Sequence, residues 1–272
     1  RMWHKYGPLC KEILHYYRQG TLYAIRMDDN GLLWQGEEGR ALTWMDAIVD
    51  GRPVTQRKGY AVEINALWYN AISFAIEMAT YAGDEKFVDE WIDIATNLPN
   101  HFQLNFWSDE HGYLADCVRP GYRDFSVRPN MLFAVSLPYS PITEHMRKAV
   151  VDKVKAELLT PRGIRTLSPS DPNYHGSCCG SQAERDMAYH QGTVWPWLLG
   201  PFVEAYIKVY GHIGVPFVRS IFGDMEASLK EKCIGTVPEI YDGDEPHTPR
   251  GAVAQAWSVA ELLRIKSIID KL

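Results

Sequence analysis

Apolar residues recur every three or four positions along most of this chain, which is the spacing that puts them on one face of an α-helix. Between residues 62 and 82, for example, this spacing links Leu67, Ala71, Phe74, Met78 and Tyr81. The same pattern predicts helices over 3–19, 62–82, 84–104, 129–137, 143–158, 194–210, 215–232 and a last segment that contains 253–263. The chain is therefore predicted to be all-α, with about eight helices.

Several of the predicted helices follow one another after very short turns. Gly83 is suited to end one helix and Asp84 to cap the next, while Thr143 is suited to begin a later helix that stops before Pro161. Long polar loops separate the pairs, over 20–61, 105–128, 159–193 and 233–251. Stacked hairpins bury their apolar stripes against one another, and long loops in a compact domain are usually functional. We therefore expect one domain, residues 1–272, with its loops on one face.

Composition excludes several classes of protein. The formal net charge of -6 gives the chain no general attraction for nucleic acid. With 46% hydrophobic residues the chain is not disordered, and no apolar run is long enough to make it an integral membrane protein. The cysteines are odd in number and lack zinc-ligand spacing, which predicts reduced thiols in a cytoplasmic protein with no metal site. They are Cys10, Cys117, Cys178, Cys179 and Cys233.

Aromatic residues are abundant, with nine Trp and fifteen Tyr. Such side chains bury a ring face while keeping a polar atom at the rim, which suits a neutral, hydroxyl-bearing ligand such as a sugar. In the loop 20–61, Trp34 and Trp44 lie near Asp46. An apolar, aromatic surrounding raises the pKa of a carboxyl group, as a general acid near neutral pH requires. The more common explanation for such an Asp is a helix cap or a salt bridge within the loop.

A second carboxylate in a mostly apolar setting is Glu239, between Pro238 and Ile240 in the last long loop. The nearby Asp242 and Asp244 flank Gly243 and are better suited to a turn. Two carboxylates from two loops could face one another across a pocket, as hydrolysis of a glycosidic bond requires. Spacing alone, however, does not single out Asp46 and Glu239 among 34 acidic residues.

Other polar and aromatic residues gather in the loops or at the starts of helices, where they could bind sugar hydroxyls or stack on a sugar ring. For each of them a structural role, in the core or in a local hydrogen bond, is the alternative explanation. Together with Trp34 and Trp44, the candidates for substrate binding are Glu63, Asn65, Arg128, Asn130, Arg165, His190, Gln191, Trp195, Gln255 and Trp257.

Three long motifs, taken together and in this order, resemble the C-terminal domain of glycogen debranching enzymes. They run from Val62 to Asn70, from Tyr189 to Trp197, and from Glu239 through Gly243 to Ala254-Gln255-Ala256-Trp257-Ser258. The resemblance begins at about Asp28 and continues to the C-terminus. It departs from the family at Ala252-Val253, where members commonly have Cys followed by an aliphatic residue.

The resemblance implies an (α/α)6 toroid of alternating inner and outer helices, with the active site at the loop-rich end. Because the predicted helices are too few for a complete ring and Arg1 falls inside a predicted helix, we expect the first helices of the toroid to be missing from this C-terminal part of a longer protein.

The resemblance further implies an amylo-α-1,6-glucosidase that releases glucose from the α-1,6 branch stubs of glycogen or limit dextrin with inversion. Its general acid would be Asp46 and its general base Glu239, with no metal and no cofactor. The alternatives are an exo-α-glucosidase or trehalase-like hydrolase on the same fold, and a glucan-binding domain without catalysis. A purely structural helical scaffold is a further reading, although it leaves the loop clusters unexplained.

Overall fold

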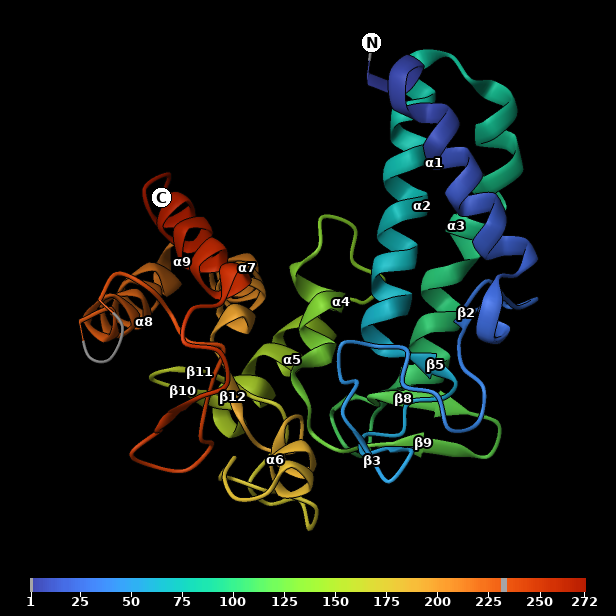
Figure 1. The fold of residues 1–272 in the computed structure, drawn as a ribbon. Coiled ribbons are helices and arrows are strands. Elements are labelled where there is room, and N and C mark those ends of the chain that lie inside the picture. Colours follow the sequence, from blue (N-terminus) through green and yellow to red (C-terminus); the bar gives the residue numbers. More distant parts are fainter. Residues whose placement is uncertain (1, 231–233) are drawn as a thin grey trace.

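The computed structural model describes residues 2–230 and 234–272 of the chain. Nine α-helices dominate these residues (Figure 1). They are α1 (Met2–Gln19), α2 (Val62–Ala82), α3 (Glu85–Phe106), α4 (Phe133–Ser136), α5 (Glu144–Glu157), α6 (Gln182–Ala188), α7 (Leu199–Tyr210), α8 (Val215–Ser228) and α9 (Ala256–Ile269). Short 3-10 turns precede or join several of them, at Leu22–Ala24, Pro129–Leu132, Pro196–Leu198 and Gly211–Gly214.

The loops contain short antiparallel strands that the sequence pattern did not predict. The largest sheet has the order β10-β11-β12-β13-β14, from Leu159–Thr160, Gly163–Arg165, Val194–Trp195, Ile240–Tyr241 and Pro249–Arg250. A three-stranded sheet joins β5 (Tyr60–Ala61), β8 (Cys117–Arg119) and β9 (Tyr122–Asp124). Three hairpins pair β1 (Arg26–Met27) with β2 (Leu33–Trp34), β3 (Ile48–Val49) with β4 (Arg52–Pro53), and β6 (Trp107–Ser108) with β7 (Tyr113–Leu114).

The structure differs from the predicted helix boundaries in two places. The helix expected over 194–210 begins only at Leu199, because Val194 and Trp195 form β12 and pair with β11 and β13. The short helix α6 lies inside what was expected to be a loop, and Ser181 begins it with a capping box to Glu184. Of the helix expected over 215–232, the described part ends at Ser228, and residues 231 and 232 lie outside the described residues.

Two of the three named helix caps, Gly83 and Thr143, are confirmed, and Asp84 is not. Gly83 ends α2 in the left-handed region, with φ of 73°, which a glycine adopts without strain. Thr143 begins α5, and its side chain accepts a hydrogen bond of 3.4 Å from the Met146 backbone N–H. Asp84 lies at the start of α3, but its carboxylate binds Trp3 and Lys11 of α1 rather than the end of its own helix.

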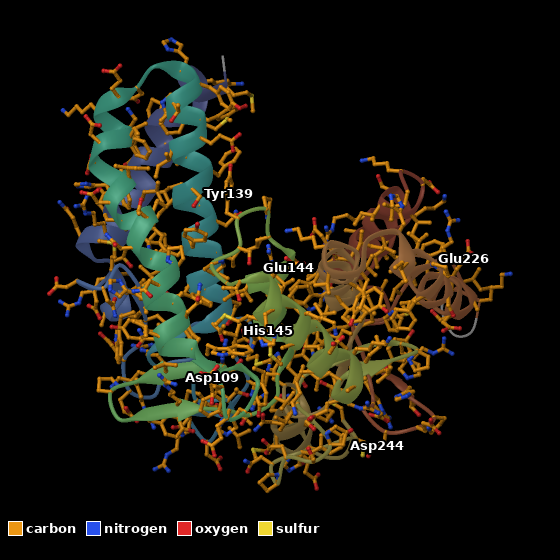
Figure 2. All side chains as sticks on the ribbon, turned by 180° about the vertical axis from the view of Figure 1, so that it is seen from behind. Asp109, Tyr139, Glu144, His145, Glu226 and Asp244 are labelled. Atoms are coloured by element: carbon orange, nitrogen blue, oxygen red, sulfur yellow. The ribbon has the colours of Figure 1, made fainter. Side chains whose placement is uncertain are left out.

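The helices pack as a row. Successive contacts join α2 to α4, α4 to α7, and α7 to α9, while α1 and α3 flank α2, α5 packs on α4 and α7, and α8 packs on α9. In Figures 1 and 2, α2 and α9 lie on opposite sides of the molecule, and in Figure 1 most of the loops that carry the strands lie along the lower side of the row. The described helices thus form an open row, and completion into a ring stays a prediction.

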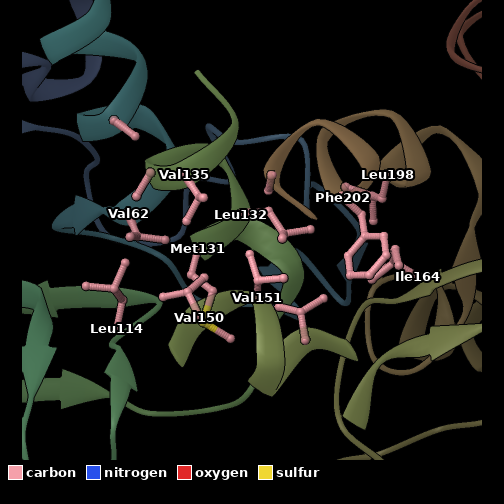
Figure 3. Packing of buried hydrophobic residues seen from close by; sticks show 14 of the residues in the cluster. Val62, Leu114, Met131, Leu132, Val135, Val150, Val151, Ile164, Leu198 and Phe202 are labelled. Carbon is pink, nitrogen blue, oxygen red and sulfur yellow. The ribbon is translucent and has the colours of Figure 1, made fainter. Parts of the chain in front are cut away.

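The core runs along this row. Between α4, α5 and α7 it includes Leu132, Val150, Val151, Leu198 and Phe202, all of them buried (Figure 3). Burying an aliphatic or aromatic side chain of this size stabilises a fold by about 1.5–3 kcal/mol. Because these contacts hold the helices, the loops at their ends are positioned as a group.

Some sequence predictions concern the whole chain. Cys10, Cys117, Cys178 and Cys179 are free thiols, whereas Cys233 lies outside the described residues, and the cytoplasmic location stays a prediction. Within the described ranges, no helix is long and apolar enough to span a membrane. Within the same ranges, no group of three or more His, Cys, Asp or Glu side chains is arranged to hold a metal ion.

Candidate active site

A hollow of about 710 Å³ opens at the loop end of the molecule. Its walls are α6 with the loop before it, Tyr189 at the end of α6, and the segment from Glu239 to Ala252 around β13 and β14. These segments meet because β12, directly after the Tyr189 turn, pairs with β13. The hollow therefore brings together two of the three motifs that carry the family resemblance.

Glu239 reaches this hollow as the residue before β13, and its side chain is half-buried. Its Oε1 accepts a hydrogen bond from the Tyr189 hydroxyl, and its Oε2 accepts one of 2.7 Å from the Ala252 backbone N–H. The two donors therefore hold both carboxylate oxygens in place at the wall of the hollow.

Gly251 makes room for that carboxylate. Its φ is +65°, and a Cβ placed there would lie 2.3 Å from Glu239 Oε2. Position 252, where the chain departs from the family, contacts Glu239 through its backbone N–H, which an alanine supplies as well as a cysteine does. The departure therefore leaves this contact intact.

Tyr189 is fixed by its own surroundings. Its backbone carbonyl accepts hydrogen bonds from Thr193 Oγ1 at 2.6 Å and from Trp195 Nε1 at 3.1 Å, and its ring centroid lies 5.1 Å from that of Trp195. Burial, the bond to Glu239 and the charges of Glu239 and Asp46 raise the pKa of Tyr189. The phenol consequently remains a donor at neutral pH.

Asp46 lies close enough for its charge to act on Tyr189. Its segment passes directly into β3, which packs against α6. The apolar surrounding expected for Asp46 is wrong for the described residues, because its side chain is exposed while Met45 before it is buried. The two carboxylates nevertheless act on one tyrosine.

Aromatic rings pack behind Asp46. The Trp44 ring stands edge-on to His190, Trp195 and Trp197, with centroids 5.2–5.4 Å apart. Trp257 stacks on Trp197 at 4.9 Å and keeps 37% of its surface exposed, whereas Trp195 is buried. Trp257 is therefore better placed than Trp195 to stack on a ligand. Trp34 lies apart from this cluster and packs edge-on against Tyr60.

A buried polar network holds Trp44. Its Nε1 donates to Asn130 Oδ1 at 2.7 Å, and Asn130 Nδ2 donates to Asp116 Oδ1 at 2.7 Å. Arg57 lies between two carboxylates. Its Nε donates to Asp116 Oδ2 at 2.7 Å, and its Nη2 donates to Glu63 Oε2 at 2.5 Å. The predicted sugar-binding residues Glu63 and Asn130 are thus buried and bonded to protein groups.

Other predicted binding residues also hold loops in place. Asn65 is buried and bonds the backbone N–H and carbonyl of Leu33 at 2.7 and 3.1 Å. Arg128 donates to the His190 carbonyl at 2.8 Å and to Gln191 Oε1 at 2.5 Å. Arg165 Nε donates to the Gly243 carbonyl at 2.9 Å. Gln255 Oε1 accepts a hydrogen bond of 3.1 Å from the Ala256 backbone N–H.

Comparison with known proteins identifies the family of this chain. A family model described as amylo-alpha-1,6-glucosidase matches residues 2–264. The chain belongs to the amylo-alpha-1,6-glucosidase family. It is 31% identical to the glycogen debranching enzyme of Saccharomyces cerevisiae, over 69% of this chain, and it spans 15% of that enzyme's length.

Solved structures of two glycosidases resemble the family member described here. A family GH78 rhamnosidase of Bacillus sp. GL1 has a TM-score of 0.60 at 17% identity, covering 97% of this chain and 24% of the rhamnosidase. The neutral trehalase of Saccharomyces cerevisiae has a TM-score of 0.57 at 17% identity, covering 78% of this chain and 39% of the trehalase. At this identity the likeness concerns the fold alone.

Sequence reasoning missed several residues of this family member's site. Tyr189, Gly251 and the Ala252 backbone all contact Glu239, and Arg57 with Asp116 anchors Trp44. Tyr189 begins one of the quoted motifs, which was the available signal for it. No spacing rule marked the other positions, because their partners are brought close only by the strand pairing.

Proposed function

We propose that this chain hydrolyses the α-1,6-linked glucosyl stubs of a branched α-glucan, with Glu239 as general base and Asp46 as general acid. The observation that carries the proposal is that Glu239 lines the hollow and is bonded to the Tyr189 hydroxyl, while the charge of Asp46, from a distant loop, raises the pKa of the same tyrosine. Membership in the amylo-alpha-1,6-glucosidase family supports this linkage and this class of substrate.

The roles of the two carboxylates follow from their surroundings. Glu239 accepts two hydrogen bonds and is suited to take a proton from an attacking water. Asp46 is exposed, and a bound sugar would cover its carboxyl group. Protonated Asp46 would then donate to the departing glycosidic oxygen.

The stereochemistry depends on the spacing of the carboxyl groups. An inverting site leaves room for water and separates them by about 6.5–9.5 Å, whereas a retaining site separates them by about 5–5.5 Å. We propose inversion, as the family resemblance implies. Trp257, at the edge of the aromatic cluster, is the proposed stacking platform for a glucosyl ring.

Asp46→Asn and Glu239→Gln test the assignment. Each should lower glucose release from a singly branched maltooligosaccharide by at least about 100-fold, because general acid–base catalysis contributes about 10²–10⁴-fold. The matched controls are Asp50→Asn, an exposed residue of the same loop, and Glu226→Gln on α8, away from the loop that carries Asp244 (Figure 2). Both should keep normal turnover, and thermal unfolding should show that all four variants fold.

A panel of substrates with α-1,6, α-1,4 and α,α-1,1 linkages decides between the proposed activity and its alternatives. Faster release from α-1,4 or α,α-1,1 linkages would indicate an exo-α-glucosidase or a trehalase-like hydrolase. Binding of branched dextrin without release of glucose would indicate a glucan-binding domain. Near-normal turnover in either Asp46→Asn or Glu239→Gln would remove that residue from the mechanism.

A further inference from the structure

Tyr189 has no role in the proposed mechanism, yet it is the described side chain that donates to Glu239. We infer that Tyr189 is a positioning residue for Glu239: its hydroxyl holds Oε1 so that the carboxylate keeps one orientation at the wall of the hollow. The inference rests on the proposed function for its consequence in turnover. Its geometry does not depend on the identity of the sugar.

The first argument is that Tyr189 cannot easily move. Two hydrogen bonds fix its backbone carbonyl, and its ring packs against those of His190 and Trp195, with centroids 4.7 and 5.1 Å away. A donor that is locked by its own contacts holds its acceptor with little loss of entropy on binding. The phenol therefore supplies a fixed reference point for the carboxylate.

The second argument is that the two oxygens of Glu239 have separate donors. The Ala252 N–H holds Oε2 from the β14 side, and Tyr189 holds Oε1 from the α6 side. With one donor removed, the carboxylate could rotate about its terminal bond, since that torsion is broad in glutamate. The Tyr189 hydroxyl thus determines which face the carboxylate presents.

The third argument concerns the neighbouring charges. Besides Tyr189, the titratable and charged groups that line the hollow with Glu239 are Cys178, Cys179, Arg185, Asp186 and Arg250. Asp46 lies outside this lining, and its charge acts on Tyr189.

Both cations of that set are engaged elsewhere. Arg250 binds Asp242, with 2.9 Å from Nη2 to Oδ2, and Arg185 donates to the Gly180 carbonyl at 2.6 Å and to Gln182 Oε1 at 2.8 Å. Within the described residues, Glu239 forms no ion pair. Its charge is therefore stabilised by the Tyr189 hydroxyl and the Ala252 N–H.

Tyr189→Phe tests the inference, because it removes the hydroxyl and keeps the packed ring. We expect kcat to fall by about 10- to 100-fold with KM within about twofold, as misplacement of a reacting group does. Substrate binding does not require the orientation of Glu239, so binding should be kept while turnover is lost.

The matched control is Tyr210→Phe. Tyr210 also donates to a carboxylate, that of Asp152, but this pair joins α7 to α5 and does not line the hollow. Tyr210→Phe should leave kcat and KM unchanged. A Tyr189→Phe variant with unchanged kcat, or with a KM that rises as much as kcat falls, would overturn the inference.

Titration of the Tyr189 phenol separates this inference from the proposed function. In the reciprocal variant Glu239→Gln, the pKa of Tyr189 should fall, because the phenol loses its charged acceptor. This titration also serves if Tyr189→Phe does not fold. An unchanged Tyr189 titration overturns the inference, whereas absence of glucose release from every glucan overturns only the function.

Discussion

His190 couples the stability of this protein to pH through a single buried side chain. Its ring stacks on Trp195, with centroids 5.4 Å apart and planes inclined by 12°, and it stands edge-on to Trp44. Neither ring nitrogen has a hydrogen-bond partner among the described residues. Burial, followed by the charges of Arg128 and Arg57, lowers the pKa of His190 to about 3.

This lowered pKa predicts a specific loss of stability in acid. Between about pH 6.5 and pH 3 the unfolded chain binds a proton at His190 that the folded chain does not. The free energy of unfolding should therefore fall with decreasing pH, by about 1.4 kcal/mol for each unit within this window, and the loss should be absent from His190→Gln.

Urea unfolding at several pH values checks this prediction, with His212→Gln at an exposed position as the control. His212→Gln should retain the full pH dependence of the unmodified protein. If the free energy of unfolding depends on pH in the same way in the unmodified protein and in His190→Gln, His190 does not cause the loss of stability in acid.

At the scale of single residues, resemblance to a family was the source of the site prediction. Asp46 and Glu239 were assigned in that way, and the structure places both near Tyr189. Their surroundings could not be predicted, because exposure of Asp46 depends on the way Met45 turns into the core. The importance of Tyr189 likewise depends on a partner that lies 50 positions away.

Secondary-structure elements were predictable where the apolar spacing continued over many helical turns. The helix pair α2 and α3 follows from many turns of apolar spacing and a glycine between them. Strands of two or three residues have no measurable period, so β12 was mistaken for the start of a helix. Pairing with β11 and β13 outweighed the helical pattern there.

The buried network of Arg57, Glu63 and Asp116 should contribute strongly to stability. Arg57, Glu63 and Asp116 are each less than 5% exposed. Arg57→Leu would leave two buried carboxylates without their cation, which should lower the free energy of unfolding by about 3–5 kcal/mol. Lys266→Met, which breaks an exposed pair with Asp270 on α9, should change it by less than about 0.5 kcal/mol. Urea unfolding at pH 7 measures both, and equal small losses would contradict a structural role for the network.

The whole molecule presents an apolar face at one end of its row of helices. On α1 the exposed residues include Leu9, Ile13 and Tyr16, and on α2 they include Leu67 and Phe74. A hollow of about 280 Å³ between the two helices is lined mostly by apolar side chains. Contiguous exposed apolar surface is typical of a contact site for another protein segment.

Paired substitutions test whether this face is free. Phe74 is 51% exposed and Phe102 is fully buried. In the isolated chain, Phe74→Ala should lower the free energy of unfolding by less than about 0.5 kcal/mol, whereas Phe102→Ala should lower it by about 3–5 kcal/mol. Size-exclusion chromatography of both variants reports association. A large loss for Phe74→Ala would indicate that another segment or a second copy covers the α2 face.

The packing of α2 on α3 and of α4 on α5 was predictable from the short turns between them. The hairpin expected from 194–210 and 215–232 was not confirmed, because α8 packs on α9. The closure of the row was not predictable. Helix periodicity records which face of a helix is apolar, and it does not record which neighbour covers that face. Leu67 and Phe74 illustrate this, since their spacing matches that of core residues although both are exposed here.

Position 251 has a bearing on how variation in this chain should be judged. The residue is exposed, and by that criterion a change to alanine would be classed as harmless. One added methyl group would nevertheless collide with the oxygen of the proposed base. In a survey of natural variants, even Gly251→Ala should therefore be regarded as damaging, although the residue lies at the surface.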